Sequence, residues 1–198
     1  KPENFDQINL DRSQQIYKER FANAADFIFL FVGAVNEATL KPLLEKYIGS
    51  LPAQAKKENF KDLGIRPPYR MVDTVFTKGT EPQSQVNIVF TTPAVFNPAE
   101  QYALVSLGEL LSIKLVEKLR EEKGGVYGVG AYGSMAKLPY PNASFTISFP
   151  CAPENVDSLT RAALDELKKI MDQGVQAEDL EKVREQQIRR LEVDLKQN

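Results

Sequence analysis

The chain has 198 residues, 42% hydrophobic and 26% charged, with a formal net charge of −2, no histidine and one cysteine. This length suffices for one substantial hydrophobic core or two small ones. The slightly negative net charge argues against a nucleic-acid-binding surface. The longest apolar run, roughly ten residues, is too short to span a bilayer. The lack of histidine excludes a Ser-His-Asp or Cys-His hydrolase site within this chain, and a single cysteine allows neither an internal disulfide nor a thiolate zinc cage.

The first part of the chain is predicted to hold two helices and a strand. Residues 1–10 are polar and are interpreted as a linker or as the edge of a partner, and residues 11–22 place a few apolar side chains among charges, as in a short helix. The apolar, β-prone residues 27–35 predict a central strand that is covered on both faces. Asn36 is suited to cap a second helix that runs through Tyr47.

The rest of the chain predicts pairs of strands between helices. Residues 71–78 and 84–92 alternate apolar and polar side chains, and the Gly-Thr-Glu-Pro at 79–82 predicts an antiparallel connection between them. The later elements expected are a helix from Pro98, a glycine-rich strand, a strand over residues 142–151, a helix that ends at Gly174 and a helix from Ala177. This order predicts an α+β fold with a largely antiparallel sheet and helices packed on one face.

The helix from Pro98 is the most strongly patterned element. Pro98 suits a first helical turn, and Asn97 can cap the free amides there. Five leucines at steps of three or four residues make one apolar stripe: Leu104, Leu107, Leu111, Leu115 and Leu119. The glycine pair at 124–125 is expected to end the helix, because glycine adopts left-handed backbone geometry without strain. Arg120 is then expected in the last helical turn, and Tyr127 just after the break.

A glycine pattern follows this helix. Residues 128–133 satisfy the spacing G-x-G-x-x-G, which holds a dinucleotide when a strand leads into it and a helix leads out. Here a helix leads in and a strand leads out. No acidic residue lies about 20 positions further on to hold a ribose, since residues 149–151 are Phe-Pro-Cys. We therefore interpret the pattern as a false positive.

Other reactive side chains give no site of their own. Cys151 ends an inward-facing strand pattern and is expected to be a buried free thiol. The charges of the last helix, with Glu178 and Asp179 near its N-terminus, are read as a solvated face that complements the helix dipole. A site made of carboxylates alone stays open, but no carboxylate pair stands out.

Two interpretations of Arg120 and Tyr127 remain open. In the first, Arg120 complements a helix C-terminus and Tyr127 pairs across a sheet. In the second, both are hydrogen-bond donors that flank a rigid glycine turn and point together at a peptide carbonyl. Donors placed where negative charge develops stabilise a tetrahedral intermediate.

Three stretches of the sequence are distinctive: FIFLFVGAVN at 27–36, YIGSLP at 47–52 and LREEKGGVYGVGAYG at 119–133. Because of these stretches, residues 21–195 resemble the C-terminal half of zinc peptidases of the pitrilysin, insulin-degrading enzyme and mitochondrial processing peptidase family. The stretch at 119–133 is the most specific to this family. In this family an arginine and a tyrosine, spaced as Arg120 and Tyr127 are, approach the scissile peptide from the half that lacks the metal.

The resemblance implies a role for each residue of that stretch. Arg120 and Tyr127 would bind the substrate carbonyl or oxyanion, while Gly124, Gly125 and Gly128 would shape the loop that presents them. It also implies a domain organisation: residues 1–22 would be a linker and short helix from a preceding domain, and residues 23–198 the C-terminal-type α+β domain of a zinc metallopeptidase.

The zinc of this family lies in the other half. There an H-x-x-E-H motif and a distant glutamate bind the metal and supply the base. Since this sequence has no histidine, it cannot be that half, and the resemblance implies no cofactor in this chain and zinc in the complete enzyme. The implied partners are a peptide substrate and the zinc-bearing half, on the same or a separate chain.

Two functions are carried forward from the sequence. The first is the substrate-binding part of a zinc endopeptidase, inert alone, which the retention of Arg120 and Tyr127 favours. The second is a non-catalytic scaffold or interaction module with the same fold, which a gene product without H-x-x-E-H would favour. The chain has no initiator methionine and is expected to be a piece of a longer protein, and relatives of the family point to the bacterial periplasm or cell envelope.

Overall fold

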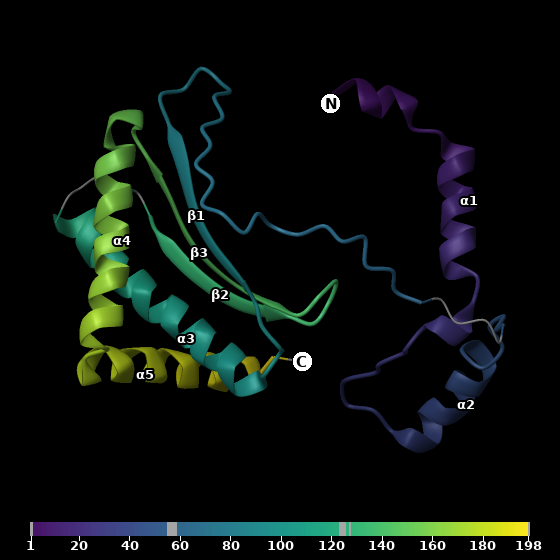
Figure 1. The fold of residues 1–198 in the computed structure, drawn as a ribbon. Coiled ribbons are helices and arrows are strands. Elements are labelled where there is room, and N and C mark those ends of the chain that lie inside the picture. The colour runs from purple at the N-terminus through teal and green to yellow at the C-terminus, as the bar shows by residue number, and fades with distance from the viewer. Residues whose placement is uncertain (1, 55–58, 123–125, 127, 198) are drawn as a thin grey trace. The chain divides into compact units, whose positions relative to one another are not determined.

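The computed structural model describes residues 2–54, 59–122, 126 and 128–197 (Figure 1). The chain forms two compact units, Lys1–Phe60 and Lys61–Gln197, which we describe separately. None of the described helices is long and apolar enough to cross a membrane. The division at residue 22 that the sequence predicts stays a prediction.

The N-terminal unit is helical in its described residues. Its elements are two short 3-10 helices, η1 (Pro2–Gln7) and η2 (Ala24–Asp26), and two α-helices, α1 (Leu10–Phe21) and α2 (Glu37–Tyr47). The predicted cap of α2 is confirmed, because the side chain of Asn36 accepts a hydrogen bond from the backbone N–H of Thr39 at 3.3 Å. Asn9 caps α1 in the same way, accepting from Arg12 N at 2.8 Å.

The predicted central strand at 27–35 is wrong, since these residues form no strand in the structure. Ile28 is 95% exposed, whereas Phe27 stacks on Phe21 of α1 with ring centroids 5.7 Å apart, and Phe29 lies 6.2 Å from Phe27. A strand needs a neighbouring strand to bond its backbone N–H and C=O groups, and the described part of this unit contains no strand that could pair with residues 27–35. Aromatic contacts with α1 therefore replace the expected sheet.

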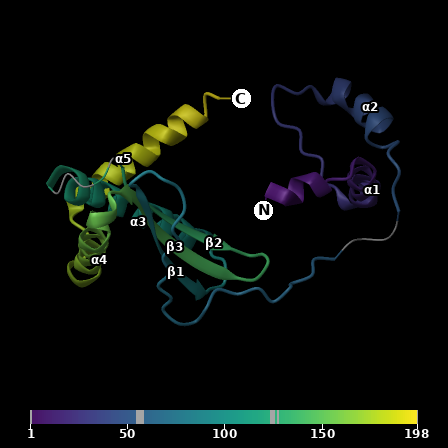
Figure 2. The same ribbon diagram turned by 90° about the horizontal axis from the view of Figure 1, so that it is seen from above.

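A three-stranded antiparallel sheet forms the centre of the C-terminal unit (Figures 1 and 2). Its strands are β1 (Ser84–Pro93), β2 (Gly130–Ala136) and β3 (Asn142–Cys151), in the order β1-β3-β2. The strands predicted at 84–92 and 142–151 and the glycine-rich strand are thus confirmed, as is the α+β class with an antiparallel sheet.

The strand predicted at 71–78 is wrong. In the structure these residues have no regular secondary structure, and Met71 is 93% exposed. Alternation of apolar and polar residues predicts a strand only where a neighbour supplies backbone partners. Among the described residues, β1 pairs with β3 alone.

Three α-helices lie on one side of this sheet (Figures 1 and 2). They are α3 (Pro98–Leu115), α4 (Val156–Gln173) and α5 (Ala177–Asp194), and a π-helical stretch, η3 (Val116–Glu122), continues α3. As predicted, Asn97 caps α3 by accepting from Ala99 N at 2.9 Å. α3 packs on β2, and α4 and α5 pack on α3.

The core lies between α3 and the sheet. Leu111, Leu115 and Leu119 of the predicted stripe are fully buried, and they face a row of alternate β3 side chains. That row is Phe145, Ile147, Phe149 and Cys151, so the inward pattern that predicted a buried free thiol is confirmed.

Two glycines let α3 approach β2 closely. A Cβ atom added at Gly108 would lie 2.8 Å from the carbonyl oxygen of Ala131, and one added at Gly133 would lie 2.5 Å from the carbonyl oxygen of Leu104. Ser112 of α3 bridges the same contact, because its Oγ accepts from Ala131 N at 2.8 Å. Gly133, the last glycine of the G-x-G-x-x-G pattern, thus serves helix–strand packing. The pattern leads into and forms part of β2 and does not open a helix, in line with its interpretation as a false positive.

Candidate functional site

The structure describes two of the five predicted site residues. Arg120 lies in η3 with its side chain exposed, and Gly128 lies between η3 and β2. Tyr127, Gly124 and Gly125 lie outside the described residues. The pairing of Arg120 with Tyr127 therefore stays a prediction.

Arg120 projects from a firmly anchored turn. Its neighbour Leu119 and the preceding Leu115 are fully buried in the core, so the backbone that leads into the arginine is held against the sheet. The change from α-helix to π-helix at Val116 widens the turn that carries them, and such π-helical stretches are frequent at functional sites. Among the side chains that the structure describes, no carboxylate forms an ion pair with Arg120.

An ion pair fastens the base of η3 to α5. Lys114 Nζ lies 2.8 Å from Asp179 Oδ2 and 3.5 Å from Glu117 Oε2. The hydrogen bond to Asp179 raises the pKa of Lys114 above its ordinary value. Asp179 is only 5% exposed, so its assignment to a solvated face is wrong. It is buried because α5 packs on α3, a contact that periodicity alone does not reveal.

A second set of polar contacts joins α3 to α5 further along. Gln187 Nε2 donates to Ser106 Oγ at 3.0 Å and to Glu109 Oε2 at 2.7 Å. Arg190 Nη1 lies 2.7 Å from Glu109 Oε1. These bonds hold α3 and α5 together. No sequence motif marks them, because the bonded residues are about 80 positions apart in the chain.

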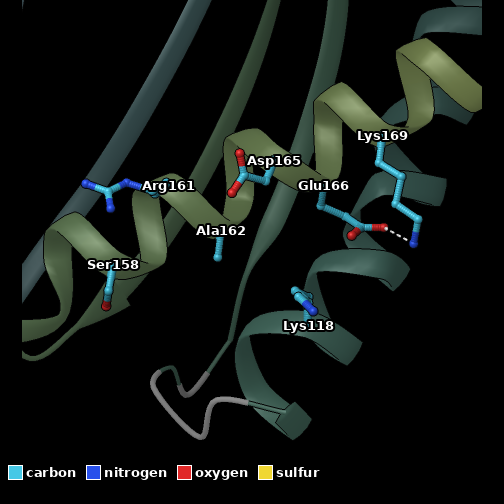
Figure 3. A pocket seen from close by; sticks show the side chains of 7 residues that line it. All are labelled: Lys118, Ser158, Arg161, Ala162, Asp165, Glu166 and Lys169. Atoms are coloured by element: carbon cyan, nitrogen blue, oxygen red, sulfur yellow. Dashed lines mark ion pairs between the residues drawn. The ribbon is translucent and has the colours of Figure 1, made fainter.

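A charged cavity of about 510 Å³ lies between η3 and α4 (Figure 3). Lys118 forms its wall on η3, and six residues of α4 form the other: Ser158, Arg161, Ala162, Asp165, Glu166 and Lys169. Lys169 Nζ pairs with Glu166 Oε1 at 3.8 Å. With three cations and two carboxylates, this surface suits a polar, mixed-charge ligand such as a peptide segment.

The described residues give no metal centre. They contain no group of three or more aspartate, glutamate or cysteine side chains placed to hold an ion, and the whole sequence lacks histidine. The donor set of this chain therefore does not fit the nitrogen-rich zinc site of an H-x-x-E-H peptidase.

Comparison with known proteins identifies the family. The sequence profile described as "Peptidase M16 inactive domain" matches residues 7–187. The probable zinc protease PqqL of Haemophilus influenzae is 26% identical over 171 residues, which is 85% of this chain and 18% of that protein. The chain thus spans about a fifth of the length of this relative.

Solved structures show the same fold. The periplasmic protease PqqL from Escherichia coli superposes with a TM-score of 0.60 at 22% identity, over 82% of this chain and 18% of that one. A protease from Helicobacter pylori superposes with a TM-score of 0.61 at 20% identity, over 83% of this chain and 40% of that one. The profile match covers most of the sequence, and the chain therefore belongs to the peptidase M16 inactive-domain family, as an inactive C-terminal-type domain of zinc proteases.

Proposed function

We propose that this domain is the substrate-binding, metal-free part of a zinc-dependent endopeptidase. A separate half with an H-x-x-E-H motif, on the same or another chain, binds zinc and carries out peptide-bond hydrolysis. Two observations support this: relatives of the chain are zinc proteases several times its length, and the sequence has no histidine with which to form an H-x-x-E-H site. Alone, the domain is expected to be inactive.

In this proposal Arg120 and Tyr127 bind the peptide carbonyl at the scissile bond. Gly124, Gly125 and Gly128 shape the loop that presents the tyrosine. The observation that carries the proposal is the exposed side chain of Arg120, which has no ion-pair partner among the described residues, next to the fully buried Leu119. A permanently charged donor held on an anchored turn suits the charge that develops on the carbonyl oxygen during attack.

The test is Tyr127→Phe in the full-length enzyme, together with Arg120→Gln. Loss of one oxyanion donor is expected to lower kcat/KM by about 100-fold or more. The matched control is Arg189→Gln, because Arg189 is an exposed arginine of α5 whose only described ion pair, to Glu185, is 3.8 Å long. An unchanged kcat/KM in both test variants would refute the donor role.

The place of action is part of the same proposal. The Escherichia coli relative is a periplasmic protease, and we propose the periplasm for the enzyme that contains this domain. Fractionation of the native host, with antibody against this domain, tests it. If the full gene product lacked H-x-x-E-H and cleaved no peptide, the domain would instead be a scaffold or interaction module.

A further inference from the structure

A second cavity, of about 240 Å³, lies beside β1 in the C-terminal unit. We call it the edge cavity. It is lined by residues 66–70, by Tyr140 and by the last part of β1, from Val89 to Pro93. Pro93 pairs with Asn142, the first residue of β3. Gly130, the first residue of β2 after η3, pairs with Ser148 towards the other end of β3. The edge cavity is therefore distinct from the predicted carbonyl-binding residues.

The edge cavity is cationic in a chain whose net charge is negative. Its lining contains two arginines and no carboxylate. Arg66 is held in place, since its guanidinium carbon lies 3.7 Å from the ring centroid of Tyr140 and its Nη1 donates to Asp62 Oδ1 at 3.0 Å. The hydrogen bond from Arg66 lowers the pKa of Asp62 to about 2, so this pair stays charged at neutral pH.

Arg70 supplies the charge that remains available. In the described part of the chain no hydrogen bond or ion pair occupies its guanidinium. Tyr69 beside it is 89% exposed, which leaves an aromatic ring open to solvent at the mouth of the cavity. Arg66 is held by Tyr140 and Asp62, whereas Arg70 has no described partner. Together with the nearby tyrosine rings, the two arginines suit a carboxylate group of a bound peptide.

The same cavity borders β1, which is an outer strand of the sheet. β1 lies at the side of the sheet, and among the described residues only β3 pairs with it (Figure 1). The outer edge of β1 thus presents backbone N–H and C=O groups without strand partners. An extended peptide adds to such an edge through its main chain and is selected by side-chain pockets.

We propose that the edge cavity binds an extended acidic peptide segment. The main chain of the segment pairs with the outer edge of β1, and a glutamate or aspartate carboxylate binds Arg70 beside the Arg66–Tyr140 stack. Charge complementarity selects this occupant, because the described lining carries two arginines and only Arg66 is paired with a carboxylate, that of Asp62. The site is independent of Arg120, and it needs neither zinc nor hydrolysis to bind.

Binding of a defined peptide to the 198-residue chain tests the proposal. The probe is a blocked, fluorescent octapeptide of alternating threonine and valine with one central glutamate, and its partner carries glutamine instead. We expect the glutamate peptide to bind about tenfold more tightly by fluorescence anisotropy, and the difference to shrink as salt rises. Arg70→Gln should abolish this difference, while Arg189→Gln on α5 should preserve it.

Further measurements distinguish the contribution of main-chain pairing with β1 from that of the charge of Arg70. A glutamate peptide that is N-methylated at alternate residues cannot pair with a strand and should lose binding, whereas equal binding would overturn the role of β1. Circular dichroism must show that Arg70→Gln is folded. Equal binding of both peptides, or displacement by inorganic phosphate as effective as by the glutamate peptide, would overturn the proposal. So would a dimer of the chain, seen by light scattering, that the peptide does not dissociate.

Discussion

Replacing Gly108 by alanine tests the packing of α3 on β2. The new Cβ atom would lie 2.8 Å from the carbonyl oxygen of Ala131 and 3.3 Å from the backbone N of Gly133. The first distance is about 0.6 Å shorter than ordinary van der Waals contact, and both partners are backbone atoms of a paired strand. The helix and the strand must therefore separate.

Two opposing effects set the magnitude. Overpacking a close contact costs about 1–3 kcal/mol, while alanine gains about 1 kcal/mol over glycine in a helix interior. The difference is a net loss of about 0–2 kcal/mol in the free energy of unfolding, and we expect a value near the middle of this range, about 1 kcal/mol. With a slope of about 2–3 kcal/mol per molar urea, the unfolding midpoint should fall by roughly 0.5 M.

The assay is urea unfolding of the C-terminal unit within the intact chain, followed by circular dichroism. Amide exchange at Ala131 gives a local readout, since separation of α3 from β2 stretches its 2.8 Å bond to Ser112 Oγ. Gly108→Val should destabilise more than Gly108→Ala because its side chain is larger. If alanine left the midpoint unchanged or raised it, the close approach of α3 to β2 would be refuted.

Two other measurements check the ion pair and the thiol. Lys114→Met should cost about 2–3 kcal/mol at pH 7, because among the described residues it leaves the buried Asp179 with one remaining cation, Lys182, at 3.8 Å. Since the pKa of Lys114 is raised, the pair stabilises the fold fully below the ordinary lysine pKa and loses its effect as the pH rises through the raised pKa of the folded state. The urea midpoints of the wild type and the variant should therefore differ at pH 7 and converge at strongly alkaline pH. Burial raises the pKa of Cys151, so a disulfide reagent at pH 8 should modify it at least about 100-fold more slowly than in urea-unfolded chain, and equal rates would show that the thiol is open.

The fold was predictable from sequence where local pattern is sufficient. The leucine stripe and the Asn97 cap predicted α3, because helix periodicity and capping depend on residues within one or two turns. The strand segments at 27–35 and 71–78 failed because a strand depends on a distant neighbour for its backbone bonds, and apolar alternation does not identify that neighbour.

The site was predictable only in part, and for the same reason. Arg120 could be placed at the end of a long helix from the glycines that follow it, and the structure puts it in η3. The burial of Asp179 could not be foreseen, nor could the edge cavity, in which Arg70 and Tyr140 meet from segments 70 residues apart. Such residues share no motif and are brought together by tertiary packing alone.

The strand order β1-β3-β2 also fixes when the sheet can assemble. In the part of the chain that the structure describes, no backbone bonds pair β1 with β2, and β3, which follows both in sequence, supplies the ladder of each. During synthesis, the apolar faces of the first two strands must wait for Asn142–Cys151 to leave the ribosome. Before then, they expose unsatisfied edges to any chaperone within reach.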